Sequence, residues 1–199
     1  MNRLFVAAIV EGHGEDAAVR TLLQRVWSEV LGGEHLEVLK PIRIKRTKIG
    51  ERKELARAVD LAALKLGSAS TGPTLILILL DAEDDCPKEF IPPFLGLARE
   101  LRADKDITCV LANPEYETWF VAAASSLSGY LELPRDEESP LAPEESRQGK
   151  GWIQKRFRGV RYSPTVDQPA MTAAMDLKLC RSRSPSFDKL CRELEARMR

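Results

Sequence analysis

The sequence lacks the features that define several large classes of protein. No apolar run approaches the roughly 18 residues that a membrane span needs, and no internal repeat is present. The four cysteines form no CxxC or Cys/His pattern, so we expect reduced thiols in a cytoplasmic protein and no zinc site. No GKS or GKT triplet marks a phosphate-binding P-loop, and the GxGxxG spacing of dinucleotide-binding proteins fails at Ala17.

A short apolar segment, Leu4–Val10, begins the chain and has to be weighed as a signal peptide. An acidic residue, Glu11, follows at once, so a first strand is the better interpretation. The chain has 199 residues, of which 44% are hydrophobic and 30% are charged. This is the composition of a soluble globular protein, and the length allows one sizeable core.

The net charge of zero conceals two regions of opposite charge. Residues 1–146 hold 17 Lys or Arg and 25 Asp or Glu, whereas residues 147–199 hold 13 and 5. One basic island, residues 43–53, lies inside the acidic region. Basic segments that flank an acidic site suit a polyanionic substrate such as nucleic acid. A solvated basic surface without a ligand is the alternative.

Hydrophobic periodicity predicts alternating strands and helices over the first 130 residues. The predicted strands are Leu4–Val10, Leu36–Ile44 with a break at Pro41, Pro73–Leu80 and Ile107–Ala112. The predicted helices are Asp16–Leu31, Glu51–Leu66, Phe94–Ala103 after a delay at Pro87, Pro92 and Pro93, and Glu115–Ser128 with Pro114 in its first turn. This alternation implies an α/β fold with a mostly parallel sheet flanked by helices.

We expect three segments along the chain: an α/β core at residues 1–131, an acidic, proline-rich loop at 132–151, and a basic helical segment at 152–199 that packs on the core. Few apolar residues and three prolines predict that the loop is long and exposed. Short helices are predicted in the last segment at Trp152–Arg158, Gln168–Cys180 and Ser186–Met198.

The most informative stretch is LILILLDAEDD, residues 75–85. Six aliphatic residues stop at Asp81, Glu83, Asp84 and Asp85, which indicates a strand that is buried on both faces of a parallel sheet. Ligands of open α/β sheets bind at the carboxyl ends of the strands. Carboxylates crowded there need a positive partner, and a hard divalent cation such as Mg²⁺ is the usual one. An acidic loop that only caps the next helix is the alternative.

A second acidic motif, EGHGE, follows the first predicted strand. Its glycines permit a tight turn with close backbone approach, and the helix beyond could receive a phosphate at its N-terminus. Glu11 would lie at the same sheet edge as Asp81 and Glu83 if the two strands are neighbours. His13, between the glycines, could contact substrate or transfer a proton. A loop histidine without either role is the alternative.

Together these motifs resemble the Toprim domain, the metal-binding catalytic domain of topoisomerases, primases and a group of nucleases. That domain has one strand ending in Glu-Gly and a later strand ending in Asp-x-Asp. The chain is still more similar to the Toprim-like proteins of domain-of-unknown-function family 4276 (DUF4276), through VEGHGE, LLDAEDD, NPEYETWF and SPSFDKL. It departs from the pattern at Glu83, where Asp is commoner.

The resemblance implies a Toprim-like four-stranded sheet and a role for each acidic residue. Asp81 and Glu83 would hold Mg²⁺ or Mn²⁺, with Asp85 as an alternative second ligand. Glu11 would act as general base or as ligand of a second metal, and Glu117 would reach the same edge, unless its charge only stabilises a helix N-terminus. Two metals about 4 Å apart could activate water and stabilise the leaving oxygen in phosphodiester cleavage.

Supporting contacts to substrate are predicted for Gly12, His13, Glu15, Glu117, Lys155 and Arg156. The segment GKGWIQKRFRG mixes cations with aromatic side chains, and such mixtures grip phosphates and stack bases. An amphipathic helix that turns its aromatic side chains into the core is the alternative.

The predicted activity is divalent-metal-dependent hydrolysis of phosphodiester bonds in DNA or RNA. The resemblance implies a phage-defence or mobile-element system with an ATPase partner, and it allows an oligomer. Two alternatives belong to other classes: a phosphoryl-transfer enzyme that acts on a free nucleotide, and a non-catalytic subunit of an ATPase complex.

Overall fold

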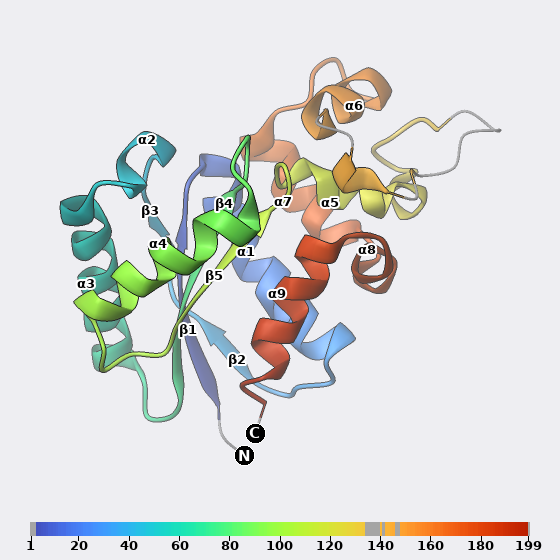
Figure 1. The fold of residues 1–199 in the computed structure, drawn as a ribbon. Coiled ribbons are helices and arrows are strands. Elements are labelled where there is room, and N and C mark those ends of the chain that lie inside the picture. The colour runs from blue at the N-terminus through green and yellow to red at the C-terminus, as the bar shows by residue number, and fades with distance from the viewer. Residues whose placement is uncertain (1–2, 134–139, 141, 146–147, 199) are drawn as a thin grey trace.

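A parallel sheet organises the structure, a computed structural model that describes residues 3–133, 140, 142–145 and 148–198 (Figure 1). The strands are β1 (Leu4–Val10), β2 (Leu36–Val38), β3 (Ile42–Arg43), β4 (Thr74–Asp81) and β5 (Ile107–Ala112). Their order is β2-β1-β4-β5, with β3 also pairing with β1, and every pairing is parallel. The predicted α/β fold is therefore confirmed. The second predicted strand forms as two short pieces because Pro41, between them, has no backbone N–H to donate.

Three neighbouring strands end at one edge of the sheet. Val10 of β1 lies opposite Leu79 of β4, and Asp81 of β4 lies opposite Ala112 of β5. Glu11, the residue after β1, is therefore level with Leu80, one residue before Asp81. The strands are aliphatic on both faces and buried along their length, as expected for a sheet that helices cover on both sides.

The helices of the first 130 residues divide between the two faces of the sheet (Figure 1). They are α1 (His13–Arg25), the π-helix η1 (Val26–Val30), α2 (Arg46–Ile49), α3 (Arg52–Ala69), α4 (Pro87–Leu101), α5 (Glu117–Ala122) and the 3-10 helix η2 (Ala124–Leu127). Side chains of α3 and α4 pack with one set of alternate strand residues, and those of α1 and α5 pack with the other set. The alternation along each strand thus separates the core into two layers.

Helix α4 corrects the predicted helix at Phe94–Ala103. It starts at Pro87 and contains Pro92 and Pro93 in its interior. Proline removes the hydrogen bond to the carbonyl four residues earlier. Here those carbonyls belong to Lys88 and Glu89, which are exposed, so water can replace the lost bonds and the helix continues. A second correction concerns the predicted helix at Glu115–Ser128, which is the short α5 followed by η2.

The C-terminal third is helical: η3 (Pro143–Glu145), α6 (Gly149–Arg156), α7 (Pro164–Ala174), α8 (Leu177–Arg183) and α9 (Pro185–Glu195). The predicted single helix at Gln168–Cys180 is wrong. The chain breaks at Met175, and Asp176 starts a new helix by accepting hydrogen bonds from the backbone of Lys178 and Leu179, both at 2.9 Å.

The described part of the predicted loop at 132–151 is less exposed than expected and includes helical residues. Pro143 is buried, and the Glu144 carboxylate accepts hydrogen bonds from the Ser184 hydroxyl at 2.5 Å and the Ser186 backbone at 2.8 Å. These contacts attach η3 to the start of α9. Pro134 and the residues up to 139 lie outside the described residues.

The C-terminal helices join the core of the α/β sheet. Met171, Cys180 and Phe187 belong to the same buried cluster as the side chains on one face of β1 and β4. Trp119 of α5 donates its indole N–H to the Ser186 hydroxyl at 2.9 Å, and its ring meets Phe187 edge-to-face at 5.2 Å between centroids. The NPEYETWF and SPSFDKL motifs, nearly seventy positions apart, therefore pack against each other.

Every helix in the described part of the chain is too short or too polar to cross a lipid bilayer. The four cysteines are free thiols. Cys109, Cys180 and Cys191 are buried and Cys86 is exposed. Burial raises the pKa of the Cys109 thiol to about 12, so this side chain behaves as a small apolar group.

Candidate functional site

Four carboxylates gather at the edge where the three strands end. Glu11 directly follows β1, Glu15 lies in the first turn of α1, Asp81 is the last residue of β4, and Glu117 is the first residue of α5 beyond β5. We call these four side chains the acid cluster. The strand order confirms the expectation that Glu11 and Asp81, seventy positions apart, lie at adjoining strand ends.

Burial and the mutual repulsion of the four carboxylates shift the pKa of Asp81. Burial raises the pKa of Asp81 well above its usual value, and the carboxylates of Glu15, Glu117 and Glu11 raise it further. The backbone N–H of Tyr116 opposes this by donating to Asp81 Oδ1 at 2.8 Å. Asp81 therefore holds a proton more readily than an exposed aspartate, unless a positive charge comes close.

The pKa of Glu11 is raised to about 7, with burial as the largest cause. The nearby carboxylates of Glu83 and Glu15 raise the pKa further, whereas the guanidinium of Arg46 lowers it. Glu11 thus titrates near neutral pH, where it can both accept and release a proton.

Glu117 has the same behaviour in a more enclosed position, since only 4% of the residue is exposed. Burial raises its pKa to about 7; Glu115 and Glu15 raise the pKa further, and Lys150 lowers it. Tyr162 lies beside Glu117, and its buried hydroxyl makes no hydrogen bond of good geometry. Burial and the Glu117 charge raise the pKa of Tyr162 well above its usual value.

Two oxygens of the acid cluster are buried without a partner, Glu11 Oε2 and Glu15 Oε2. The other oxygen of Glu15 accepts a hydrogen bond from Gln168 Nε2 at 3.2 Å. A buried acceptor without a donor is costly, by roughly 1–3 kcal/mol or more for a charged group. Bare carboxylate oxygens of this kind are the donors that hard divalent cations prefer.

The acid cluster is not a finished coordination sphere. Within the described ranges, no three His, Cys, Asp or Glu side chains are placed to hold a metal ion together. The donors are carboxylate oxygens, whose chemistry fits Mg²⁺ or Mn²⁺.

The acidic loop, Glu83–Asp85, lies apart from the acid cluster. Its three side chains are exposed, and Glu83 adopts a positive φ of 51° that turns the chain sharply after β4. Glu83 still lies close enough to raise the pKa of Glu11. Asp81 is thus the only carboxylate of the predicted Asp81/Glu83/Asp85 set that joins the acid cluster.

Arg46, the first residue of α2, pairs with this acidic loop. Its guanidinium forms an ion pair with Asp85 and lies 3.8 Å from Glu83 Oε2. The guanidinium stacks on the ring of Phe90, with 4.8 Å between Arg46 Cζ and the ring centroid. The two carboxylates that the resemblance offers as second metal ligand therefore already have a cationic partner, which the sequence alone did not reveal.

The EGHGE turn has a packing role in addition to a conformational one. Gly12 caps the start of α1, and a Cβ at this position would lie 2.1 Å from Glu15 Oε2. A Cβ on Gly14 would lie 1.6 Å from Gln168 Oε1. Both glycines thus make room for polar side chains of the site. His13, between them, is exposed.

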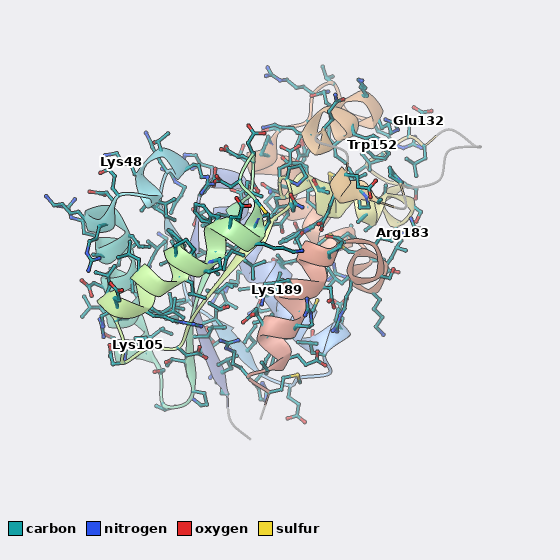
Figure 2. The ribbon with its side chains drawn as sticks, viewed as in Figure 1. Lys48, Lys105, Glu132, Trp152, Arg183 and Lys189 are labelled. Carbon is teal, nitrogen blue, oxygen red and sulfur yellow. The ribbon has the colours of Figure 1, made fainter. Side chains whose placement is uncertain are left out.

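The predicted supporting cations Lys155 and Arg156 lie at the far end of α6. With Glu132 they line a cavity of about 360 Å³, and Arg156 stacks over Trp152 with 4.1 Å to the ring centroid. Figure 2 shows Trp152 and Glu132 beside this helix. The α6 cation whose charge reaches the acid cluster is instead Lys150 at the near end, which lowers the pKa of Glu117.

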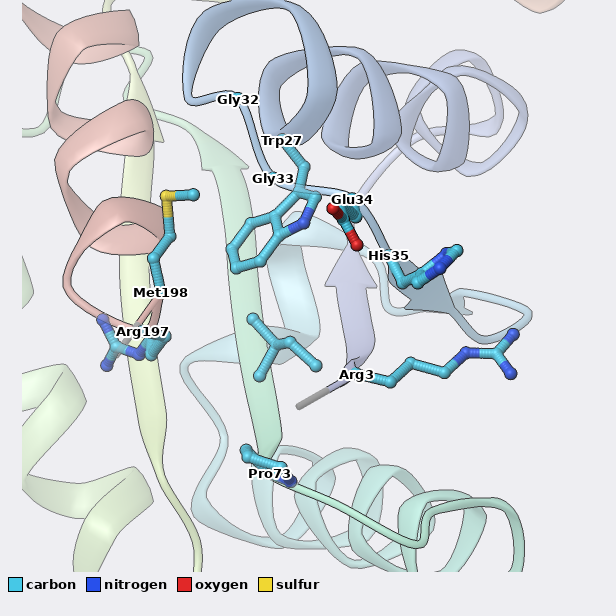
Figure 3. Close-up of a pocket in the computed structure, with 10 residues that line it drawn as sticks. Arg3, Trp27, Gly32, Gly33, Glu34, His35, Pro73, Arg197 and Met198 are labelled. Carbon is cyan, nitrogen blue, oxygen red and sulfur yellow. The ribbon is translucent and has the colours of Figure 1, made fainter. Parts of the chain in front are cut away.

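A cavity of about 380 Å³ lies at the opposite edge of the sheet (Figure 3). Leu4 and Pro73, at the start of β1 and just before β4, line it together with Trp27 and His35. Since β1 has seven residues, this cavity is about 20 Å from the acid cluster along the strand. Glu34 is the one carboxylate among the described residues that line it.

Fold and site together define a parallel α/β protein with a cluster of carboxylates at the carboxyl ends of its strands. The chain belongs to the family described as domain of unknown function DUF4276, whose model matches residues 10–195. The match includes the whole acid cluster, Arg46 and the C-terminal helices through α9. No curated protein and no solved structure matches the chain.

Proposed function

We propose that this protein is a Toprim-like hydrolase that cleaves phosphodiester bonds with the help of Mg²⁺ or Mn²⁺. One observation carries the proposal: the ends of adjacent strands and the helices that follow them bring four carboxylates together, and burial and mutual repulsion raise the pKa values of Glu11, Asp81 and Glu117. A site of this kind gains strongly from a bound cation, because the cation neutralises the repulsion and gives the dehydrated carboxylates a charged partner.

In this proposal, the carboxylates of the acid cluster bind the metal and transfer a proton. Asp81 would hold the metal, with the unpartnered oxygens of Glu11 and Glu15 as further donors. The metal would supply Lewis-acid activation of the phosphate and of water. Glu11 follows β1 beside the end of β4, so it would accept the proton of the attacking water where it is not itself bound to the metal.

Nucleic acid is the proposed substrate, because positive charge borders the acidic edge. Exposed side chains of the basic island, Arg43, Lys45 and Lys48, surround α2 near the acidic loop; Figure 2 shows Lys48 projecting from this end of the molecule. Phosphate contacts from such side chains do not depend on base sequence and weaken with salt. The proposal covers DNA and RNA alike.

A second candidate rests on Arg46. Because this guanidinium already neutralises Glu83 and Asp85, the edge has a built-in counter-ion, which suits a non-catalytic or nucleotide-directed subunit of an ATPase complex. Calorimetry with Mn²⁺ separates the candidates. Binding that Asp81→Asn abolishes supports the hydrolase, whereas absence of binding in wild type together with a co-purifying ATPase supports the subunit.

The direct test is cleavage of plasmid DNA and of RNA in Mn²⁺ by wild type, Asp81→Asn and the control Asp84→Asn, whose side chain is exposed in the acidic loop. We expect wild type and Asp84→Asn to cut and Asp81→Asn to lose at least about 100-fold in rate, more than is lost when a residue that only supports a metal ligand is removed. Hydrolysis of free nucleotides without cutting of either polymer would refute the nuclease and favour the nucleotide-directed candidate.

A further inference from the structure

A glutamine from the C-terminal segment lies inside the site that the α/β core builds. Gln168 in α7 is fully buried. Its Nε2 donates to Glu15 Oε1 at 3.2 Å, across 153 positions of the chain. Buried polar side chains are retained where they hold another polar group, and Glu15 is the carboxylate that Gln168 holds.

The chain is shaped around this contact. Gln168 Oε1 occupies the space that a Cβ on Gly14 would need, at 1.6 Å, and the carbonyl oxygen of Pro164 closes the same space at 3.0 Å. Glu15 Oε2 in turn uses the space left by Gly12. The glycines of EGHGE are therefore needed for the approach of α7 to α1, whether or not they also bind phosphate.

Helix α7 is fixed firmly enough to position a side chain. The Tyr116 hydroxyl and the Thr172 hydroxyl share a buried hydrogen bond of 2.9 Å. Arg25 of α1 donates to the backbone oxygens of Thr172 at 2.8 Å and Met175 at 3.0 Å. The C-terminal end of α7 is thus attached to α1, which carries Glu15, and to Tyr116, which precedes Glu117.

We infer that Gln168 is a positioning residue for Glu15. By donating to Oε1, the amide fixes the carboxylate and leaves Oε2 without a donor, available to a cation. The C-terminal helical segment then completes the site and does more than cover the sheet. This inference rests on the proposed metal-dependent function.

The experiment uses the full chain with four variants. Gln168→Met keeps length and shape but removes the N–H donor, and Gln168→Glu places a second carboxylate against Glu15. The double variant Glu15→Gln/Gln168→Glu exchanges amide and carboxylate across the same contact. Gln24→Met, on the exposed face of α1, is the matched control. Mn²⁺ affinity by calorimetry, kcat and the KM for Mn²⁺, and urea unfolding are measured for each.

We expect Gln168→Met to weaken Mn²⁺ binding by about 10–100-fold, the usual effect of removing an outer-shell partner, with a raised KM for Mn²⁺. Gln168→Glu should weaken binding at least as much. The double variant should regain the urea midpoint that Gln168→Glu loses, because an amide again faces a carboxylate. It should not regain the Mn²⁺ affinity, because the carboxylate is then on α7 and no longer on α1. Gln24→Met should match wild type in all measurements.

Two results overturn the inference while the proposed function stands: Gln168→Met binds Mn²⁺ and cuts as wild type does, or the exchanged pair regains Mn²⁺ affinity together with stability. A wild-type protein that neither binds Mn²⁺ nor cuts nucleic acid overturns the proposed function and this inference together. The wild-type measurement therefore distinguishes the two failures.

Discussion

The acid cluster and the acidic loop carry charges of the same sign, share the end of strand β4, and behave in opposite ways. Glu117 is buried, Glu11 and Asp81 are partly buried, and all three have raised pKa values. Glu83 and Asp85 are exposed and pair with Arg46. The acidic residues of the loop are consecutive in the sequence. Those of the acid cluster are far apart in the sequence, but their charges raise the pKa of Asp81 in the folded chain.

The difference shows that burial, more than the number of neighbouring acids, makes a carboxylate useful for chemistry. An exposed carboxylate keeps its hydration and gains little from a cation, because exposed ion pairs contribute about 0–1 kcal/mol. A buried carboxylate has lost that hydration, so a cation both neutralises the repulsion and replaces the lost water.

The largest expected difference between the two regions is in catalysis. Glu11→Gln should lower kcat by at least about 100-fold, because a general base contributes about 10²–10⁴-fold. Glu83→Gln, in the exposed loop, should change kcat by no more than a few-fold. Steady-state cleavage rates at saturating Mn²⁺ measure both. An equal loss of kcat in the two variants would mean that Glu83 is a metal ligand, as the resemblance implies. The acid cluster and the acidic loop would then not differ in function.

The second largest effect is expected in how the stability of the acid cluster depends on pH. The pKa of Glu117 rises from 4.5 to about 7 on folding, so between these values the folded state binds more protons than the unfolded state. The free energy of unfolding should therefore fall as pH rises through this window, by up to about 3 kcal/mol for this group. Glu117→Gln should match wild type near pH 4 and exceed it at pH 8.

Urea unfolding at pH 4, 6 and 8 measures this difference, with Gln24→Met on the exposed face of α1 as the control. This control removes no titratable group, so its stability difference from wild type should stay constant over the same range. If the stability difference between Glu117→Gln and wild type also stays constant with pH, folding does not raise the pKa of Glu117.

Packing around the acid cluster gives the next effect in size. Gly14→Ala should lower the free energy of unfolding by about 1–3 kcal/mol, since its Cβ would overlap Gln168. Gly67→Ala is the matched control in helix α3, where nothing lies within 4 Å of the added Cβ, and it should stabilise by about 0.5–1 kcal/mol. The urea midpoints of both proteins provide the test, and a harmless Gly14→Ala would argue against the close approach of α7.

The smallest effect is expected at Arg46. Arg46→Gln should cost about 1 kcal/mol or less, because its carboxylate partners are exposed. Removing its positive charge should at the same time tighten Mn²⁺ binding a few-fold, since Arg46 lowers the pKa of Glu11 and so competes with a cation. Calorimetry decides the sign, and weaker binding would mean that Arg46 supports the metal.

Much of the fold follows from the sequence, because aliphatic runs such as Leu75–Leu80 have few alternatives to a buried strand. Sequence also located Glu11 and Asp81, since parallel strands end at one edge. The boundaries of α4 could not be predicted, because the tolerance of Pro92 and Pro93 depends on which carbonyls face water.

The rest of the site could not be read from the sequence because it depends on contacts between distant segments. The EGHGE motif indicated Glu15, but its hydrogen bond with Gln168 forms only in the folded chain, where α7 returns to α1. Arg46 meets the acidic loop while its guanidinium lies over the ring of Phe90, more than forty positions away. No local pattern distinguishes Gln168 or Arg46 from ordinary helix residues.

Diffraction from crystals soaked in Mn²⁺, recorded at a wavelength where manganese scatters anomalously, tests the central claim most directly. We predict an anomalous peak between Glu11 and Asp81, within reach of Glu15, in wild type and none there in Asp81→Asn. A wild-type peak confined to the exposed carboxylates Glu83 and Asp85, or no peak at this edge of the sheet, would contradict the account.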